Sequence, residues 1–442
     1  MRAILQEYAE IKNLRNSGLI GFSHGINEFY GLALPPVIPL LVADLDITYA
    51  QAGLLLTVFY AMYSIFQLPA GLVADYVGKK RLLVWGLLGM AAGLVLASTA
   101  QSYELLLVSQ AVMGVCGSTY HPTGMAMISD TETKDTEGKA MGLFGLGGML
   151  GIASAPLVIG GIAAVVDWRT ALLAAAVLGV FVTGLFQLLY RTPTSEPPKP
   201  NGGSLAEPSD RRETERPDGG EPDVRTDKNV RPGVTTRVRR GLQRAVRFEI
   251  TPGLVLISLI TLLVSLQIRS IQTFTTGFLT DGTGQTASVA NGIFFVMLSA
   301  SAISSIWVGS LADRFDRGRL GAVAAITTSL LLLSTVLVVA LDAAAIDWLA
   351  TGGLVVVFGL LGLAVYGCTP IKNALISEYA TTDSSGSIFG VTQTGSSIGS
   401  AAGPAIFGYV ATEFSIAVAF PLIAVVGGII AAGFYALSSK NE

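Results

Sequence analysis

Apolar segments of membrane-spanning length recur along the whole chain and are separated by short polar stretches. A helix needs about 20 consecutive apolar residues to cross a bilayer, and the pattern predicts twelve such helices. They cover residues 19–43, 51–74, 82–100, 104–129, 140–165, 169–190, 253–279, 288–311, 320–341, 350–378, 386–411 and 415–437. We therefore predict an all-α integral membrane protein whose twelve transmembrane helices form two bundles of six.

One long polar segment divides these helices into two groups. Residues 191–250 are rich in Pro, Gly and charge, which predicts a largely disordered linker. Its end, "TRVRRGLQRAVRFEI", is basic and amphipathic, and we expect it to lie on an anionic membrane surface rather than on nucleic acid. The predicted domains are an N-terminal six-helix bundle (1–190), the linker (191–250) and a C-terminal six-helix bundle (251–442).

The placement of charge predicts the orientation in the membrane. Only 13% of the residues are charged, about half the share in soluble domains. Outside the linker, the segments on the side of the termini hold twelve Lys and Arg residues, whereas the loops on the other side hold only Arg169. Both termini and the linker are therefore expected in the cytoplasm, with the protein in the cell membrane. Cys116 and Cys368 lie in separate apolar segments, so no disulfide, metal site or cofactor is predicted.

The chain contains an internal repeat. "GLVADYVGKKR" (71–81) follows the second predicted helix, and "GSLADRFDRGR" (309–319) follows the eighth. "GLFGLGGMLGIASAPLVIGG" (142–161) aligns with "GVTQTGSSIGSAAGPAIFGY" (390–409). The two halves are therefore predicted to be pseudo-symmetric copies of one six-helix unit. Such repeats place a binding site at their interface near the bilayer midplane, and rocking of the halves gives alternating access.

The repeated loop resembles the loop signature of the major facilitator superfamily of transporters. The resemblance implies that superfamily's fold and a cytoplasmic gate, in which each loop reaches an acidic residue at the end of helix four or ten. The gate residues that it implies are Gly71, Asp75, Gly78, Lys79, Asp130, Gly309, Asp313, Arg317 and Glu378. We expect these groups to latch the outward-facing state; the alternative is that they are topology charges at the membrane edge. Asp316 stands where the first loop has Gly78, so the second turn is expected to differ.

Glycines and prolines recur in predicted helices five and eleven. Glycines four residues apart form a smooth face for close helix packing, and a proline removes a helix hydrogen bond and bends the helix. These residues are Gly147, Gly151, Pro156, Gly395, Gly399, Gly403 and Pro404. The first run resembles the helix-five signature of antiporters in the superfamily, and ordinary close packing explains it equally well. Antiporters also often carry an arginine in helix four, where this chain has Gln110.

Polar and ionisable side chains inside the predicted helices are candidates for a transport pathway, because burying charge in a bilayer is costly. They are His24, Asn27, Glu28, Tyr30, Gln110, His121, Gln267, Arg269, Gln272, Lys372 and Asn373. Glu28 is the candidate proton carrier; the alternative is a permanent pair with Arg269 or Lys372 that only holds helices together. The two histidines either relay protons or are satisfied hydrogen-bond donors. Lys372 is also a candidate for binding an anion.

Two further stretches narrow the resemblance. "SHGINEFYGLALPPVIPLLVADLDITYAQAGLL" (23–55) and "GSTYHPTG" (117–124) resemble the fosmidomycin-resistance branch of the superfamily. That branch implies proton-driven efflux of small, often anionic compounds. Thr123 stands where we expect a carboxylate, which leaves the substrate open.

Other functions stay as alternatives. The second prediction within the transporter class is an uptake carrier for a metabolite or organic anion. A non-transporting membrane sensor is more remote, and an enzyme is not predicted, because we find no nucleophile constellation, metal cluster or ATP-binding loop. The expected partners are a small-molecule substrate, protons and membrane lipid, and we expect the protein to function as a monomer.

Overall fold

Helices occupy every predicted membrane span. The computed structural model describes residues 11–192, 251–343, 347–379 and 385–438, so nearly all of the predicted linker lies outside the described residues. Within these ranges all regular structure is helical. The helices are α2 (Leu14–Gly31), α3 (Ile38–Leu45), α4 (Tyr49–Val77), α5 (Lys79–Ser98), α6 (Tyr103–Gly117), α7 (Tyr120–Thr131), α8 (Lys134–Ala155), α9 (Gly161–Val165), α10 (Trp168–Leu189), α12 (Pro252–Gly277), α13 (Ala287–Ala312), α14 (Arg317–Ala343), α15 (Asp347–Tyr379), α16 (Ser385–Glu413) and α17 (Ile416–Ser438).

Three short segments complete the paths across the membrane. They are the 3-10 turn η1 (Pro35–Val37) and the π-helical turns η2 (Pro156–Gly160) and η3 (Phe278–Gly282). Ten helical paths in the described chain are long and apolar enough to cross a bilayer. The other two predicted spans correspond to the consecutive helices α6 and α7 and to the Gly- and Ser-rich α16. The predicted all-α membrane fold is confirmed.

Prolines explain the interruptions in three of these paths. The 3-10 turn between α2 and α3 begins at Pro35. Pro122 has no N–H to donate to the carbonyl of Ser118, and α6 gives way to α7 at this point. Pro156 begins the π-helical turn between α8 and α9. Its repeat partner Pro404 lies inside the unbroken α16, so the two copies differ here.

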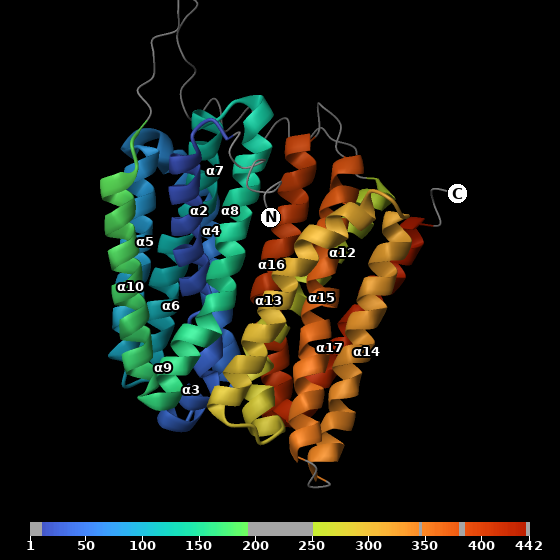
Figure 1. Cartoon of the computed structure of the whole chain (residues 1–442). Helices are drawn as coiled ribbons and strands as arrows, with labels where there is room; N and C mark the ends of the chain where they lie inside the picture. The colour runs from blue at the N-terminus through green and yellow to red at the C-terminus, as the bar shows by residue number, and fades with distance from the viewer. Residues whose placement is uncertain (1–10, 193–250, 344–346, 380–384, 439–442) are drawn as a thin grey trace, which may run out of the picture. The chain divides into compact units, whose positions relative to one another are not determined.

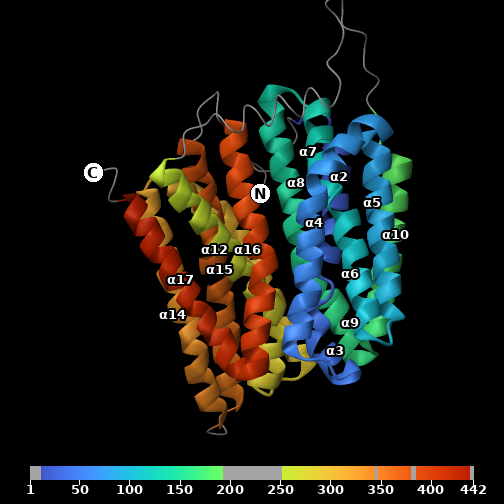
Figure 2. The ribbon, with the colours of Figure 1, turned by 180° about the vertical axis from the view of Figure 1, so that it is seen from behind.

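The same pairs of helices pack together in both halves. Helix α2 packs on α8 as α12 packs on α16, and α5 packs on α10 as α14 packs on α17. Figure 1 shows α2 to α10 (blue to green) grouped on one side and α12 to α17 (yellow to red) on the other, and Figure 2 shows the same grouping from behind. The two six-helix groups belong to one compact unit, joined mainly by α4 on α16 and by α8 on α13.

Glycine permits the tightest contacts within each half. A Cβ on Gly151 of α8 would lie 2.0 Å from the carbonyl oxygen of Gly25 on α2. In the second half, a Cβ on Gly399 of α16 would lie 2.0 Å from the carbonyl oxygen of Leu262 on α12. The other predicted packing glycines that face the partner backbone in this way are Gly147, Gly395 and Gly403. Larger residues would push the two helices of each pair apart.

The loops that carry the repeated signature turn in different ways. Gly78 joins α4 to α5 with φ +94, a conformation that side-chain-bearing residues rarely adopt. At the equivalent place Asp316 caps α14: the Arg319 backbone N–H donates to Asp316 Oδ1 at 2.6 Å. That N–H holds the pKa of the Asp316 carboxyl below its ordinary value, and the Ser438 hydroxyl adds a second hydrogen bond. A cap therefore replaces the glycine turn in the second copy.

Candidate functional site

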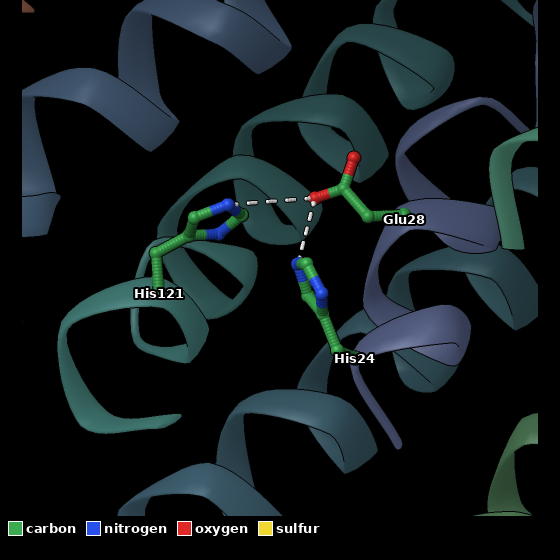
Figure 3. Close-up of side chains that lie close together, drawn as sticks. All are labelled: His24, Glu28 and His121. Atoms are coloured by element: carbon green, nitrogen blue, oxygen red, sulfur yellow. Dashed lines mark ion pairs between the residues drawn. The ribbon is translucent and has the colours of Figure 1, made fainter. Parts of the chain in front are cut away.

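Three side chains of the N-terminal half converge on one point (Figure 3). Glu28 and His24 lie one turn apart on α2, and His121 lies near the start of α7. Glu28 Oε1 lies 3.6 Å from His24 Nε2 and 3.9 Å from His121 Nε2. Asn27 Nδ2 donates to the same carboxylate oxygen at 3.3 Å. We call His24, Glu28 and His121 the His–Glu–His cluster.

Hydrogen bonds at the opposite ring nitrogens orient both histidines. His24 Nδ1 lies 2.8 Å from the carbonyl oxygen of Phe144, which can only accept, so Nδ1 carries the hydrogen. His121 Nδ1 lies 2.7 Å from the Tyr63 hydroxyl. His24 Nε2 is buried and has no hydrogen-bond partner among the described residues. Both rings therefore present Nε2 to Glu28.

Aromatic packing holds the His24 ring in place. The ring stacks on Phe144 with centroids 3.8 Å apart and an interplanar angle of 7°. Tyr120 stacks at 5.4 Å, and His121 meets the ring edge-on at 4.9 Å. His24 is only 5% exposed, so its ring has little freedom to turn away from Glu28.

Glu28 and His121 border a cavity between the two halves. The cavity encloses about 170 Å³. Its lining comes from α2, α4, α7 and α8 of the first half and from α12 and α16 of the second. The polar lining residues are Asn27, Glu28, Tyr60, Tyr63, Ser64, Gln67, His121, Arg269, Gln393, Ser396, Ser397 and Ser400.

Arg269 of α12 is the basic residue in this lining. Its guanidinium carbon lies 4.5 Å from the centroid of the Tyr60 ring, and its Nη1 donates to Gln272 Oε1 at 2.7 Å. The Gln272 amide donates in turn to the Tyr366 hydroxyl. Among the described residues, Arg269 forms no ion pair with a carboxylate, and the titratable groups beside Glu28 are the two histidine rings. The alternative of a permanent Glu28–Arg269 pair is therefore not what the structure shows.

Other predicted pathway residues lie away from the cavity. Tyr30 donates to the Ala176 carbonyl, and Gln110 contacts Ser109 and Met113 inside the first half. Gln267 lies 3.5 Å from the Ile423 carbonyl inside the second half. Lys372 donates to Asn373 at 3.2 Å, and neither residue lines the described cavities. No Glu28–Lys372 ion pair is present among the described residues.

Several residues that line the cavity were not among those predicted from the sequence. Tyr60, Tyr63 and Gln67 of α4 face the cavity, as does a polar stripe on α16. The stripe follows helical spacing and consists of Gln393, Ser396, Ser397 and Ser400. The spacing of these four residues is visible in the sequence and could have indicated a polar helix face. Small polar residues at the same spacing also serve helix packing, so the spacing does not by itself indicate a cavity.

The two halves meet tightly at one end of the cavity. Near the N-terminus of α4, Thr57 Oγ1 donates to the Ala401 carbonyl at 2.7 Å, and the Ala50 N–H donates to Thr412 Oγ1 at 2.8 Å. A Cβ on Gly53 would lie 2.2 Å from the Pro404 carbonyl oxygen.

A larger hollow adjoins the cavity between α4, α7 and α16. It encloses about 810 Å³ and shares Ser64, Gln67, His121, Gln393 and Ser397 with the cavity lining. Its other walls come from α4, α7 and α16: they are Ala61, Ile65, Leu68, Pro122, Met125, Gly390, Thr394, Ile398 and Ala401. The contacts between α4 and α16 thus close the cavity toward the N-terminus of α4, and on the other side the hollow reaches Leu68, Met125 and Gly390.

The predicted gate residues form ion pairs within each half. Lys79 Nζ lies 2.5 Å from Asp130 Oδ2, and Arg317 pairs with Glu378. Arg317 also lies 3.8 Å from Asp313, whereas no hydrogen bond or ion pair joins Asp75 to another described residue. Each pair joins the start of one helix to the end of another in its own half: α5 to α7, and α14 to α15.

The predicted gate glycines have open surroundings. A Cβ on Gly71 would make only an ordinary contact with Pro122, 3.7 Å away. A Cβ on Gly309 would meet no described atom within 4 Å. Neither position requires glycine for a close helix approach in this conformation.

Comparison with known proteins shows the class to which the chain belongs. A family model of the Major Facilitator Superfamily matches residues 18–366 and 257–442. The chain therefore belongs to this superfamily. A bacterial homologue of the human lysosomal transporter Spinster, crystallised in an inward-facing and occupied conformation, has the same fold: the TM-score is 0.74 at 15% identity, over 96% of each chain.

Named relatives match the chain at higher identity but over shorter stretches. The chain is 25% identical over 190 residues to a probable L-galactonate transporter of Escherichia coli, a match covering 42% of each chain. It is 27% identical over 140 residues to the fosmidomycin resistance protein of Escherichia coli, covering 32% of this chain and 34% of that one. The chain thus spans less than half the length of these relatives.

Proposed function

We propose that this chain is a secondary transporter that moves a small anion across the cell membrane by alternating access, coupled to protons. One observation carries the proposal: Arg269 of one half borders the same cavity as the His–Glu–His cluster of the other half. Rocking of the two repeats around such a cavity exposes it to each side of the membrane in turn.

The cavity has the chemistry of an anion site. Arg269 offers a planar set of N–H donors and has no acidic partner among the described residues. An arginine of this kind suits a carboxylate or a phosphate-like group. The hydroxyl and amide groups of α4 and α16 supply further hydrogen bonds. A volume of about 170 Å³ limits the substrate to a small molecule.

The cluster has the chemistry of a proton site. Because His24 Nδ1 donates to a carbonyl, the neutral ring turns a bare Nε2 toward Glu28 Oε1, 3.6 Å away. Two acceptors then face each other, and a proton on either group turns this repulsion into an attraction. His121 lies beside both groups and borders the cavity, which gives the proton a path to water.

Efflux in exchange for protons is the direction that the resemblance implies. The stretches 23–55 and 117–124 carry that resemblance, and the fosmidomycin resistance protein is among the relatives. The positive-inside rule places the Gly78 loop and both termini in the cytoplasm. In that orientation the tight contact between Gly53 of α4 and Pro404 of α16 lies toward the outer side, and an exporter collects its substrate from the cytoplasm. The two six-helix domains move as halves of a monomer in this scheme.

Uptake of an anion together with a proton is the second candidate, and the charge arrangement favours it. A proton on the cluster leaves Arg269 as the dominant charge in the cavity, so the proton and an anion stabilise each other's binding. The probable L-galactonate transporter is a relative whose named substrate is an anion.

Proton movement in proteoliposomes tests the function and separates the two directions. The vesicles enclose a pH-sensitive dye, and nitrate, a sugar acid or a small phosphonate is added outside. Entry of the anion with a proton acidifies the lumen, and exchange for a proton makes it alkaline. We expect Glu28→Gln to abolish the pH change, whereas Glu104→Gln, an exposed carboxylate, leaves it intact. A pH change that is equal in wild type and Glu28→Gln overturns the proton role of Glu28, and no pH change with any anion overturns the proposed coupling.

A further inference from the structure

The His–Glu–His cluster also has the geometry of a metal site. One ligand atom from each of the three residues lies within 4.8 Å of the other two. Zinc binds nitrogen and oxygen ligands at about 2.0–2.2 Å, so neighbouring ligand atoms of a tetrahedral site are about 3.3 Å apart. The observed separations of 3.6 and 3.9 Å from Glu28 need only a small closure.

Both histidines already have the outer hydrogen bonds of metal ligands. A histidine bound to metal through one ring nitrogen almost always donates its other N–H to an oxygen, which fixes the tautomer and the ring orientation. His24 donates from Nδ1 to the Phe144 carbonyl, and His121 Nδ1 contacts the Tyr63 hydroxyl. The His24 bond leaves the Nε2 lone pair of that ring directed at Glu28, and His121 also turns its Nε2 toward Glu28.

A second, independent observation points to a missing ligand. His24 is 5% exposed and held between aromatic rings, yet its Nε2 has no hydrogen-bond partner among the described residues. An unpaired buried nitrogen is costly. A bound cation at this point satisfies it without moving the ring.

We propose that His24, Glu28 and His121 bind one divalent transition-metal ion of the zinc class. Two imidazoles and one carboxylate suit Zn²⁺, Co²⁺ or Ni²⁺ and disfavour Mg²⁺ and Ca²⁺, which take oxygen ligands. Three protein ligands leave a fourth position, and the cavity beside Glu28 and His121 gives water or an anion access to it. The Glu28 carboxylate offsets part of the repulsion between the metal ion and Arg269, which borders the same cavity.

The proposal goes beyond the proposed transport function and does not depend on it. The binding test uses purified full-length protein in detergent, with no substrate and no gradient. A failure of metal binding therefore leaves the transport proposal standing, and a failure of transport leaves the metal site standing. The proposed metal site and the proposed proton site share Glu28 and His24. A bound metal ion therefore excludes the proton from these two residues.

Zinc titration by calorimetry is the first measurement. The protein carries no histidine tag, and Cys116→Ser and Cys368→Ser form the background, because thiolates also bind zinc. We expect one Zn²⁺ per chain, and a loss of affinity of at least about 100-fold in His24→Gln, Glu28→Gln and His121→Gln. Tyr63→Phe removes only the outer hydrogen bond to His121 and is expected to weaken binding about 10-fold. Glu104→Gln is the matched carboxylate control and is expected to bind as the background does.

Histidine NMR tests the proposal without mutating any of the three metal-binding residues. The chain has only two histidines, so selective ¹⁵N-histidine labelling reports on this cluster alone. Zn²⁺ is expected to shift the Nε2 resonances of both rings and to leave both Nδ1 nitrogens protonated. Unshifted rings at saturating Zn²⁺, or calorimetric binding that is unchanged in His24→Gln and Glu28→Gln, overturns the proposal. Monodisperse elution and an unchanged helical circular dichroism spectrum confirm that each variant is folded.

Discussion

Gly53 of α4 meets Pro404 of α16 so closely that a Cβ on Gly53 would lie 2.2 Å from the proline's carbonyl oxygen. Each residue belongs to a different half, and the contact lies at the closed end of the cavity. The neighbouring atom belongs to backbone, which cannot rotate away as a side chain would. The close approach of the two helices at this end therefore requires a glycine at position 53.

Gly53→Ala is expected to shift the protein toward conformations in which α4 and α16 separate at this end. The added methyl group needs about 1 Å or more of backbone movement to reach an ordinary contact. Spin labels at Gln101 and Glu413, exposed residues of the two halves, report the opening as a longer distance. Gly145→Ala, whose Cβ would meet no described atom within 4 Å, is the matched control. Identical distance distributions in the two variants would contradict the steric argument.

Arg269 is expected to set the affinity for the anion. Arg269→Gln removes the charge, and we expect binding to weaken about 10- to 100-fold, in line with the loss of charge-assisted hydrogen bonds. Arg269→Lys keeps the charge but loses the planar donors and the stacking on Tyr60, so an intermediate loss is expected. Equilibrium binding of a radiolabelled anion measures both. Lys372→Gln is the control, because Lys372 contacts Asn373 outside the described cavities, and an equal loss in that variant counts against the assignment.

The Lys79–Asp130 pair is expected to matter for turnover more than for stability. The two side chains are 28% and 57% exposed, so the pair contributes less than about 1 kcal/mol to folding. The pair ties the loop at Gly78 to α7, and we propose that it keeps the first half rigid as the halves rock. Asp130→Asn is expected to slow exchange with little change in substrate affinity, and the swap Lys79→Asp with Asp130→Lys is expected to restore part of the rate. Flux assays measure the transport rate, and parallel thermal unfolding measures the stability of each variant. A normal transport rate in Asp130→Asn would indicate that Lys79 and Asp130 act only as charges that set the membrane topology.

Asp316 is expected to make a pH-dependent contribution to stability. Its folded pKa lies below the ordinary value, chiefly because of the Arg319 backbone N–H. The charged form therefore stabilises the fold fully above about pH 4, and this contribution is lost as pH falls through the lower folded pKa. Asp316→Asn is expected to cost about 0.5–1 kcal/mol at pH 7, a modest value for an exposed helix cap, and less at lower pH. Thermal unfolding of wild type and Asp316→Asn in detergent, at pH 7 and at the lower pH, measures the loss of stability. Asp313→Asn, at an exposed carboxylate, is the control. A loss of stability that is equal at the two pH values would exclude the charge of Asp316 as its cause.

Most of the fold could be predicted from the sequence because a bilayer constrains it strongly. Every membrane-crossing segment must be long, apolar and internally hydrogen-bonded. Each span is therefore visible in the sequence as a long apolar run. The interruptions were harder to place. Pro156 and Pro404 are repeat partners, yet one begins a π-helical turn and the other lies in a continuous helix. A proline by itself therefore does not decide whether the helix is interrupted.

The candidate site was only partly accessible from sequence. Glu28 and His24 share a helical stripe, and the cost of burying them marks them as candidates. The sequence could not give the partner of Glu28. A pair with Arg269 or Lys372 was the alternative to a proton-carrying Glu28, whereas the structure brings His121 to Glu28 and keeps Arg269 on Tyr60. Tyr30, Gln110 and Gln267 were expected beside the pathway, and they lie within the two halves instead.

The sequence by itself determined the spans, the repeat and the set of buried polar groups, because these follow from periodicity, hydropathy and the cost of charge in lipid. Only the tertiary structure decided which of those groups meet. The separation of two side chains on different helices depends on how the helices cross and rotate, and packing along the whole length of both helices sets that crossing. The convergence of His24, Glu28 and His121, with Arg269 bordering the same cavity, is a property of that packing and of no single segment.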